Sequence, residues 1–174
     1  MKKWIIRIVI VIIGLVFISL IYGATIGEQS FEVEVSIDAD SKLCWDVMQD
    51  PGNLNKWLKD FKEIEMTSDG IPGSVGTSYE LTFEDNDHEM FMTQELIEIK
   101  PNELLSAKLT SSVLTGNMRI TLSKNEDGST KITNKSVYEG TNPITSLAMM
   151  FSHEKMVESQ QESYLKLKEL IESE

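Results

Sequence analysis

The segment from Ile144 to Glu174 contains neither glycine nor proline, and the residue before it is Pro143. Proline is favoured in the first turn of a helix and disfavoured later, so this pattern predicts one long C-terminal helix that begins near Pro143. A helical wheel of about 100° per residue groups one largely apolar face: Met149, His153, Met156, Val157, Gln160, Tyr164, Leu167 and Ile171. A single amphipathic helix of this kind must cover an apolar surface supplied by the rest of the chain.

The residues before this helix predict strands that can supply such a surface. Phe31, Val33, Val35 and Ile37 alternate with polar residues, which is the period-two pattern of a half-buried strand. Further strand-like segments are separated by turn-rich clusters: 61–68, 75–84, 88–99, 104–111, 116–124 and 130–139. We therefore expect an α+β helix-grip fold, in which a curved antiparallel sheet of six to seven strands holds the C-terminal helix.

Two short helices are predicted between the first two strands. Asp40 or Ser41 can cap a helix with a stripe of apolar residues, formed by Leu43, Cys44, Val47 and Met48. Asp50-Pro51-Gly52 ends this helix, and Pro51 can start a second one over 53–58. The two helices are expected to plug one end of the sheet. Cys44 is the only cysteine, so no internal disulfide is possible, and we expect it to be buried.

The N-terminus predicts a separate element. Three basic residues, Lys2, Lys3 and Arg7, precede nineteen residues from Ile8 to Ile26 in which Tyr22 is the only ionisable side chain. At about 1.5 Å per residue the run gives roughly 28 Å of helix, close to the ~30 Å hydrocarbon thickness of a bilayer. It therefore predicts one N-terminal transmembrane helix.

Charge favours one orientation for this helix. Because the basic residues precede the apolar run, the N-terminus is expected in the cytoplasm. We thus expect a single-pass membrane protein with an anchor in residues 1–27 and an extracytoplasmic domain in 28–174. A cleaved signal peptide is the alternative, with a weak cleavage site at Gly23, Ala24 and Thr25.

The expected domain is strongly acidic. It holds all 28 acidic residues and, because three basic residues precede it, 13 of the 16 basic ones, for a net charge of −15. No basic stripe is present, so nucleic acid is not an expected partner. The acidic cluster at 84–89 lacks the glycine-centred loop of an EF-hand and is interpreted as a hairpin tip. No metal site, cofactor or catalytic residue is predicted.

Short segments of the chain carry a resemblance to a known superfamily: Cys44-Trp45 leading to Asp50-Pro51 and Trp57, Gly70 to Thr77 before one strand, and Lys100 to Leu105 before another. They are similar to the SRPBCC or START-like superfamily, in particular its polyketide cyclase/dehydratase-like branch, over about residues 30–172. The resemblance implies a deep, mostly apolar cavity between the sheet and the long helix. It also implies that lipids, sterols, polyketides or other hydrophobic molecules bind there.

Candidate cavity residues come from the helix and from the inward faces of the strands. His153 and Gln160 interrupt an apolar helix face, and either a ligand or a core partner can explain them. Asn134, Ser136 and Tyr138 make one face of the last strand unusually polar, which indicates a polar pocket or a face assignment shifted by one residue. The predicted ligand-binding residues are Trp57, Tyr79, Phe83, Asn134, Ser136, Tyr138, Met149, His153, Gln160 and Tyr164.

Three functions remain open from the sequence. The first is membrane-tethered binding of a hydrophobic or amphipathic, lipid-like small molecule. The second is a cyclase or dehydratase-type enzyme, with His153 as general base and Tyr79 or Tyr138 as hydrogen-bond donor. The third is a protein-interaction or stress-response domain whose own side chains fill the core. The sequence does not predict an oligomeric state.

The first turns of the long helix carry a second apolar surface. Ile144, Leu147, Met150 and Phe151 fall on a different wheel face from the stripe that contains His153. This surface either rests on the short-helix segment around Leu54 and Trp57, or forms a mobile lid over the cavity mouth that opens toward a bilayer.

Overall fold

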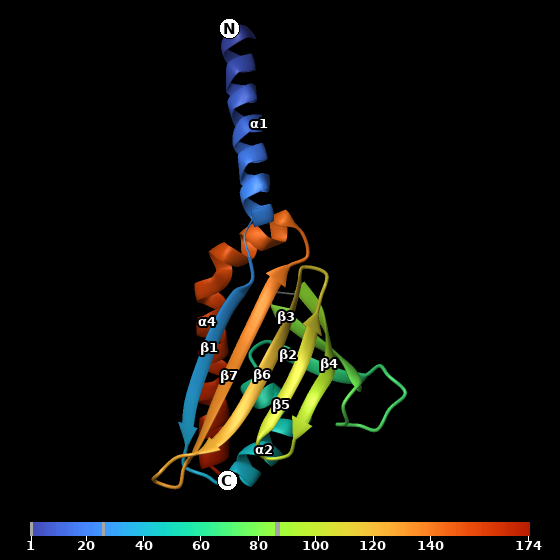
Figure 1. Ribbon diagram of the computed structural model, residues 1–174, viewed down its shortest axis with the longest axis vertical. Helices are drawn as coiled ribbons and strands as arrows, with labels where there is room; N and C mark the ends of the chain where they lie inside the picture. Colours follow the sequence, from blue (N-terminus) through green and yellow to red (C-terminus); the bar gives the residue numbers. More distant parts are fainter. Residues whose placement is uncertain (1, 26, 86–87) are drawn as a thin grey trace.

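The computed structural model describes residues 2–25, 27–85 and 88–174, and within the first helix it leaves the side chains of residues 2, 3, 19, 20, 22 and 24 undescribed. The elements follow the predicted order (Figure 1): α1 (Lys2–Thr25), β1 (Gln29–Ile37), α2 (Ser41–Gln49), α3 (Leu54–Trp57), β2 (Phe61–Met66), β3 (Ser78–Asp85), β4 (His88–Lys100), β5 (Leu104–Thr110), β6 (Leu114–Lys124), β7 (Thr130–Gly140) and α4 (Pro143–Glu172).

The strands form one seven-stranded sheet in the order β1-β7-β6-β5-β4-β3-β2, and every neighbouring pair is antiparallel. The first strand therefore pairs with the last, which places β1 beside the strand that leads into α4. α4 packs on β1 and β7, and most of its length runs along one face of the sheet (Figure 1). The predicted α+β helix-grip fold, with an antiparallel sheet and a long C-terminal helix, is confirmed.

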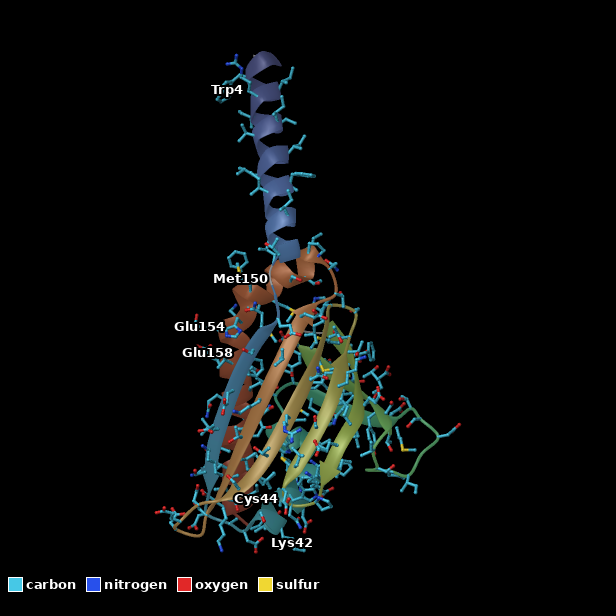
Figure 2. The ribbon with its side chains drawn as sticks, in the orientation of Figure 1. Trp4, Lys42, Cys44, Met150, Glu154 and Glu158 are labelled. Carbon is cyan, nitrogen blue, oxygen red and sulfur yellow. The ribbon has the colours of Figure 1, made fainter. Side chains whose placement is uncertain are left out.

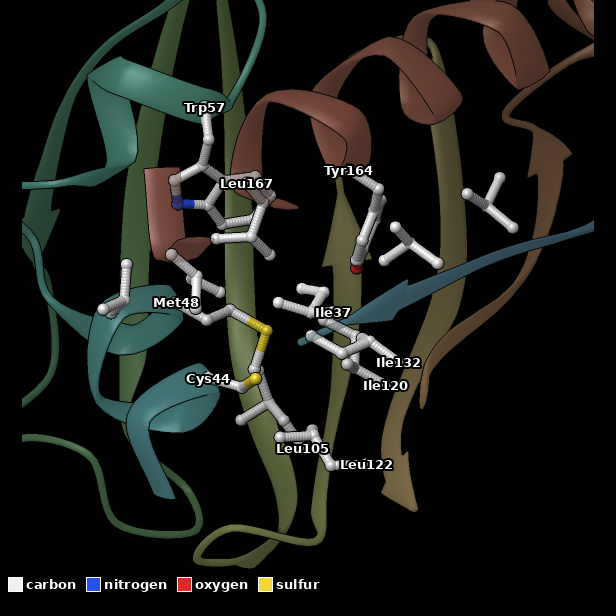
Figure 3. Close-up of a cluster of buried hydrophobic side chains, with 14 of the residues drawn as sticks. Ile37, Cys44, Met48, Trp57, Leu105, Ile120, Leu122, Ile132, Tyr164 and Leu167 are labelled. Carbon is white, nitrogen blue, oxygen red and sulfur yellow. The ribbon is translucent and has the colours of Figure 1, made fainter. Parts of the chain in front are cut away.

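The main core lies between this inner face of the sheet, α2, α3 and the C-terminal half of α4 (Figure 3). Cys44, Met48, Ile132 and Leu167 point into it and are at most 2% exposed. Asp40 caps α2 by accepting a hydrogen bond from the backbone N–H of Leu43, at 2.8 Å. The capping residue and the apolar stripe thus orient α2 toward the core, and the expectation that Cys44 is buried is confirmed.

One strand begins later than predicted. The strand-like segment predicted over 75–84 includes Val75 and Thr77, but the strand begins at Ser78 and both residues lie in the loop before it. The hydroxyl groups of Ser74 and Thr77 donate to the Ile71 carbonyl at 2.7 and 2.8 Å. Gly76 has a φ of 87°, in the left-handed region that favours glycine. These bonds close a turn, and Val75 is consequently 60% exposed.

α1 projects from the end of the domain at which α4 begins (Figure 1). Over the described residues, no helix reaches the combined length and apolarity required of a membrane span. The transmembrane helix predicted for Ile8 to Ile26 is thus not found in the structure, and Ile26 lies outside the described residues.

Candidate functional site

A row of buried polar side chains connects β7 to α4. Asn134 and Ser136 are each 1% exposed and face α4 from the inner side of β7. The Ser136 hydroxyl donates to Asn134 Oδ1 at 3.0 Å, and Asn134 Nδ2 donates to Gln160 Oε1 at 3.4 Å. Buried polar groups need such partners, so the polar face predicted for this strand is real and is satisfied from the helix. The alternative of a one-residue shift in the face assignment is wrong.

Two buried tyrosines border this polar row. Burial raises the pKa of Tyr138, and a hydrogen bond with Ser136 opposes that rise in part. Burial also raises the pKa of Tyr164, with a smaller contribution from Tyr138 and an opposing hydrogen bond with Asn134. Both phenols are therefore held neutral, and they add hydrogen-bonding groups without adding a charge.

The Phe31 ring adjoins the polar row from β1 and brings Tyr138 and His153 close to it. The Phe31 ring is 5.7 Å from the Tyr138 ring and 6.3 Å, edge-on, from the His153 ring. Phe31 pairs with Ser136 across β1 and β7, which explains how it reaches this position. The predicted combination of His153 as base with Tyr138 as donor has no hydrogen bond between the two groups among those described. Instead, both rings share Phe31 as a neighbour.

Next to the polar row is a second, smaller apolar cluster. Its buried members are Leu109, Leu114, Tyr138 and Met149, and partly buried Phe31, Met92, Met118 and Met156 pack against them. Met118 lies in the interior of the sheet, where it pairs with Ala107 on one side and Ser136 on the other. It faces α4 and yet stays partly exposed, so solvent reaches this part of the inner face.

We refer to the partly exposed residues around the polar row as the inner-face site. It consists of Phe31, Met92, Met118, His153, Met156 and Gln160. Methionine side chains are flexible and polarisable, and they adapt to ligands of irregular shape. The site thus combines an adaptable apolar surface with amide and hydroxyl groups at its base.

The structure brings most of the predicted site residues together. Asn134, Ser136, Tyr138, His153 and Gln160 form or adjoin the polar row. Met149 lies in the smaller cluster and is 7% exposed, and Tyr164 lies at the boundary with the main core. Their role in binding stays a prediction. Sequence reasoning did not place Phe31, Met92 and Met118 in the site, because no sequence pattern gives the pairing order of the strands.

Three other predicted site residues lie elsewhere. Trp57 is 4% exposed in the main core, its ring is 5.8 Å from that of Tyr164, and its indole N–H has no hydrogen-bond partner among the described atoms. The Tyr79 hydroxyl accepts a hydrogen bond from the backbone N–H of Gly73 at 2.7 Å. Phe83 packs edge-on against Phe61, with ring centroids 6.0 Å apart, in the strands farthest from β7.

The acidic cluster predicted at a hairpin tip joins β3 to β4. Lys62 on β2 bridges Glu84, at 2.9 Å, and Glu89, and the hydrogen bonds to Glu89 and then Glu84 raise the pKa of the lysine. Asn86 and Asp87 lie outside the described residues. In the described part of the chain, no group of three or more His, Cys, Asp or Glu side chains is arranged to hold a metal ion.

A separate groove of about 300 Å³ lies on the opposite face of the sheet, where β5, β6 and β7 meet the start of β1. Lys108, Asn117 and Glu139 line it and are exposed. The groove is lined mainly by polar and charged residues, and it differs in this respect from the inner-face site.

Comparison with known proteins agrees with this geometry. A family model described as "Polyketide cyclase / dehydrase and lipid transport" matches residues 28–172. No curated protein sequence matches the chain.

Solved structures share the fold at low sequence identity. Ara h 8.0201 aligns with a TM-score of 0.67 and 14% identity, over 85% of this chain and all of that one. The Zhui aromatase/cyclase from Streptomyces sp. R1128 aligns with a TM-score of 0.64 and 13% identity, over 82% of this chain and 93% of that one. The protein SA2116 from Staphylococcus aureus, described as of unknown function, aligns with a TM-score of 0.67 and 16% identity, over 84% of this chain and 95% of that one.

Proposed function

Because the chain belongs to the polyketide cyclase/dehydrase and lipid transport family, we propose that it binds an apolar or amphipathic small molecule at the inner-face site. One observation carries the proposal: Met118 faces α4 from the interior of the sheet and still remains partly exposed. A closed core does not leave an interior methionine accessible, since native interiors are packed as densely as organic crystals. The accessible apolar surface is suited to a ligand.

The chemistry of the site indicates the kind of molecule. Met92, Met118 and Met156 offer contacts to a hydrocarbon chain or ring. A ligand hydroxyl or carbonyl can replace one of the hydrogen bonds that now join the Gln160 amide, the Asn134 amide and the Ser136 hydroxyl. No Asp, Glu, Lys or Arg side chain belongs to the site, so a ligand with a neutral polar end fits better than an ionised one. We assign it the class of lipid-like molecules.

A catalysed reaction is not part of the proposal. The rings of His153 and Tyr138 both contact the Phe31 ring. Tyr79, on β3, instead accepts a hydrogen bond from the backbone N–H of Gly73 in the preceding loop. The Tyr79 hydroxyl is therefore engaged at Gly73, and among the described hydrogen bonds none joins His153 to Tyr138. The name of the aromatase/cyclase describes that neighbour and leaves the reaction chemistry of this chain open.

We also propose that the domain is held at a membrane by α1, with residues 28–174 on the extracytoplasmic side. The support is the sequence, in which the basic residues precede the uncharged run from Ile8. In addition, apolar side chains along the helix are exposed to solvent; the exposed fractions of Ile10, Phe17 and Ile18 lie between 63% and 65%. Protease added to intact spheroplasts should then remove the domain. A full-length chain that survives this treatment argues against the topology.

Binding can be tested with a matched pair of charge substitutions on α4. Met156→Glu places a carboxylate in the inner-face site, whereas Leu165→Glu places it on the outward side of the same helix, where Leu165 is 47% exposed. Each full-length protein is purified in mild detergent, and its bound small molecules are extracted and identified by mass spectrometry. Retention of a fluorescent monoacylglycerol analogue, whose polar end is neutral, is measured in parallel.

We expect the wild type and Leu165→Glu to retain ligand and probe, and Met156→Glu to lose at least tenfold in probe affinity. Gln160→Leu should keep the fold and weaken retention of ligands with a polar end. If Met156→Glu and Leu165→Glu behave alike, the inner-face site is not where the molecule binds. Empty wild-type protein that also fails to retain the probe favours the filled-core alternative.

A further inference from the structure

Two large apolar side chains on the first turns of α4 are open to solvent. Ile144 is 67% exposed and Phe151 is 75% exposed. The expectation that these turns rest on the segment around Leu54 and Trp57 is wrong, because that segment meets α4 much farther along. There the Lys59 N–H donates to Ser163 Oγ at 3.2 Å, and Trp57 packs on Tyr164. Nothing described in the domain explains the exposed pair.

The stretch of chain that carries this pair is uncharged, in a strongly acidic protein. Residues 141–152 contain no charged side chain, although the chain carries 28 acidic and 16 basic residues. The first acidic residue after them is Glu154. Figure 2 shows Met150 close to the end of α1, and Glu154 and Glu158 successively farther from it. The acidic surface of α4 therefore begins only away from α1.

Backbone contacts fix the position of these turns. A Cβ added to Gly23 near the end of α1 would lie 2.3 Å from the Pro143 carbonyl oxygen, so the two backbones touch. A Cβ on Gly140 at the end of β7 would lie 2.2 Å from the backbone nitrogen of Ser146. Asn142 caps α4 by accepting hydrogen bonds from the N–H groups of Ile144 and Thr145, at 3.0 and 3.1 Å. The start of α4 is thus held between α1 and the sheet.

We propose that Ile144 and Phe151 insert into the interfacial layer of a lipid bilayer and orient the domain on it. This inference rests on the proposed membrane attachment through α1. Apolar, uncharged first turns of α4 beside an exposed apolar helix fit a lipid surface, since exposed apolar patches rimmed by polar residues mark such contacts. Acidic residues elsewhere are repelled by anionic lipids, and this repulsion favours the same orientation.

The orientation has a consequence for the inner-face site. His153 and Met156 follow Phe151 on the same helix, so a bilayer that holds Phe151 lies within two turns of the proposed site. A lipid-like ligand can then pass between the bilayer and the site over a short path.

An environment-sensitive probe tests the contact. Phe151→Cys is labelled with the fluorophore NBD in the full-length chain, which is reconstituted into phosphatidylcholine vesicles with and without phosphatidylglycerol. Leu165→Cys is the matched control, because Leu165 is 47% exposed on the same helix and lies 14 residues beyond Phe151, away from α1 (Figure 1). Cys44 needs no replacement, since it is fully buried and burial raises the pKa of its thiol.

We expect NBD at position 151 to show blue-shifted emission and several-fold stronger quenching by spin-labelled lipids than NBD at position 165. Gly23→Val should reduce this quenching without preventing attachment, because the added side chain forces α1 away from Pro143. Flotation of each protein with vesicles is measured first, and failure to float counts against the proposed attachment itself. Flotation with equal quenching at positions 151 and 165 overturns only the present inference. A blue shift that depends on protein density and not on lipid quencher shows contact between copies and also overturns it.

Discussion

The two halves of α4 lie in different surroundings, although they form one continuous helix. In the C-terminal half, Tyr164, Leu167 and Ile171 are at most 2% exposed and pack against the main core. In the N-terminal half, only Met149 is buried, whereas Ile144 and Phe151 are 67% and 75% exposed. The helix therefore stabilises the domain with one half and presents accessible surface with the other.

This difference indicates where stability and binding reside. Burial of a large aliphatic side chain contributes about 1.5 to 3 kcal/mol, so the C-terminal half accounts for most of the helix's contribution to folding. The N-terminal half adds little by this measure, and its accessible residues are free to contact a ligand or a surface. The polar row at Gln160 marks the boundary between the halves.

Truncation of one apolar residue in each half of α4 tests whether the two halves differ in their contribution to stability. Leu167→Ala removes a fully buried side chain and should lower the free energy of unfolding by about 2 to 5 kcal/mol. Phe151→Ala should change it by less than about 0.5 kcal/mol, because Phe151 is exposed. Urea titration of the full-length proteins measures both values. Similar losses for the two variants show that the halves do not differ in packing.

Replacing Asn134 tests the polar row at the boundary between the two halves, because its amide links Ser136 to Gln160. Asn134→Leu keeps a similar volume but removes the hydrogen bonds of the Asn134 amide to the Ser136 hydroxyl and to the Gln160 carbonyl. We expect a loss of about 1 to 3 kcal/mol for these hydrogen bonds. Ser30→Ala, on an exposed position of β1, serves as the control. An unchanged unfolding midpoint for Asn134→Leu means that water or a ligand replaces the amide.

The smallest expected effect concerns charge on the exposed side of α4. Hydrogen bonds from Lys59 and then Lys166 lower the pKa of Glu162 from 4.5 to about 2. A carboxylate with a lowered folded-state pKa stabilises the fold above pH 4.5 and loses this contribution as the pH falls toward 2. Glu162→Gln should thus be slightly less stable than wild type at pH 7, with the difference fading near pH 2 and in high salt. Urea midpoints at both pH values measure it, and a difference that grows toward acid contradicts this pKa assignment.

Local patterns in the sequence predicted much of the fold and part of the site. Period-two alternation correctly placed Asn134, Ser136 and Tyr138 on one face of a strand, because successive side chains point to opposite sides. Helical periodicity likewise placed Gln160 and Tyr164 on the inner face of the last helix. Phe31 and Met118 could not be assigned in this way, since their proximity to these groups depends on β1 and β6 pairing on either side of β7.

The element order, the buried faces and the one long amphipathic helix were predictable from sequence, because they follow from residue spacing within a single segment. The strand order, the separation of Phe83 from the polar row and the contact of Gly23 with Pro143 follow only from the folded chain. Each of these joins residues far apart in the chain, and no local propensity encodes such a pairing. They arise because the fold must cover the apolar face of the sheet and, at the same time, give the buried amides hydrogen-bond partners.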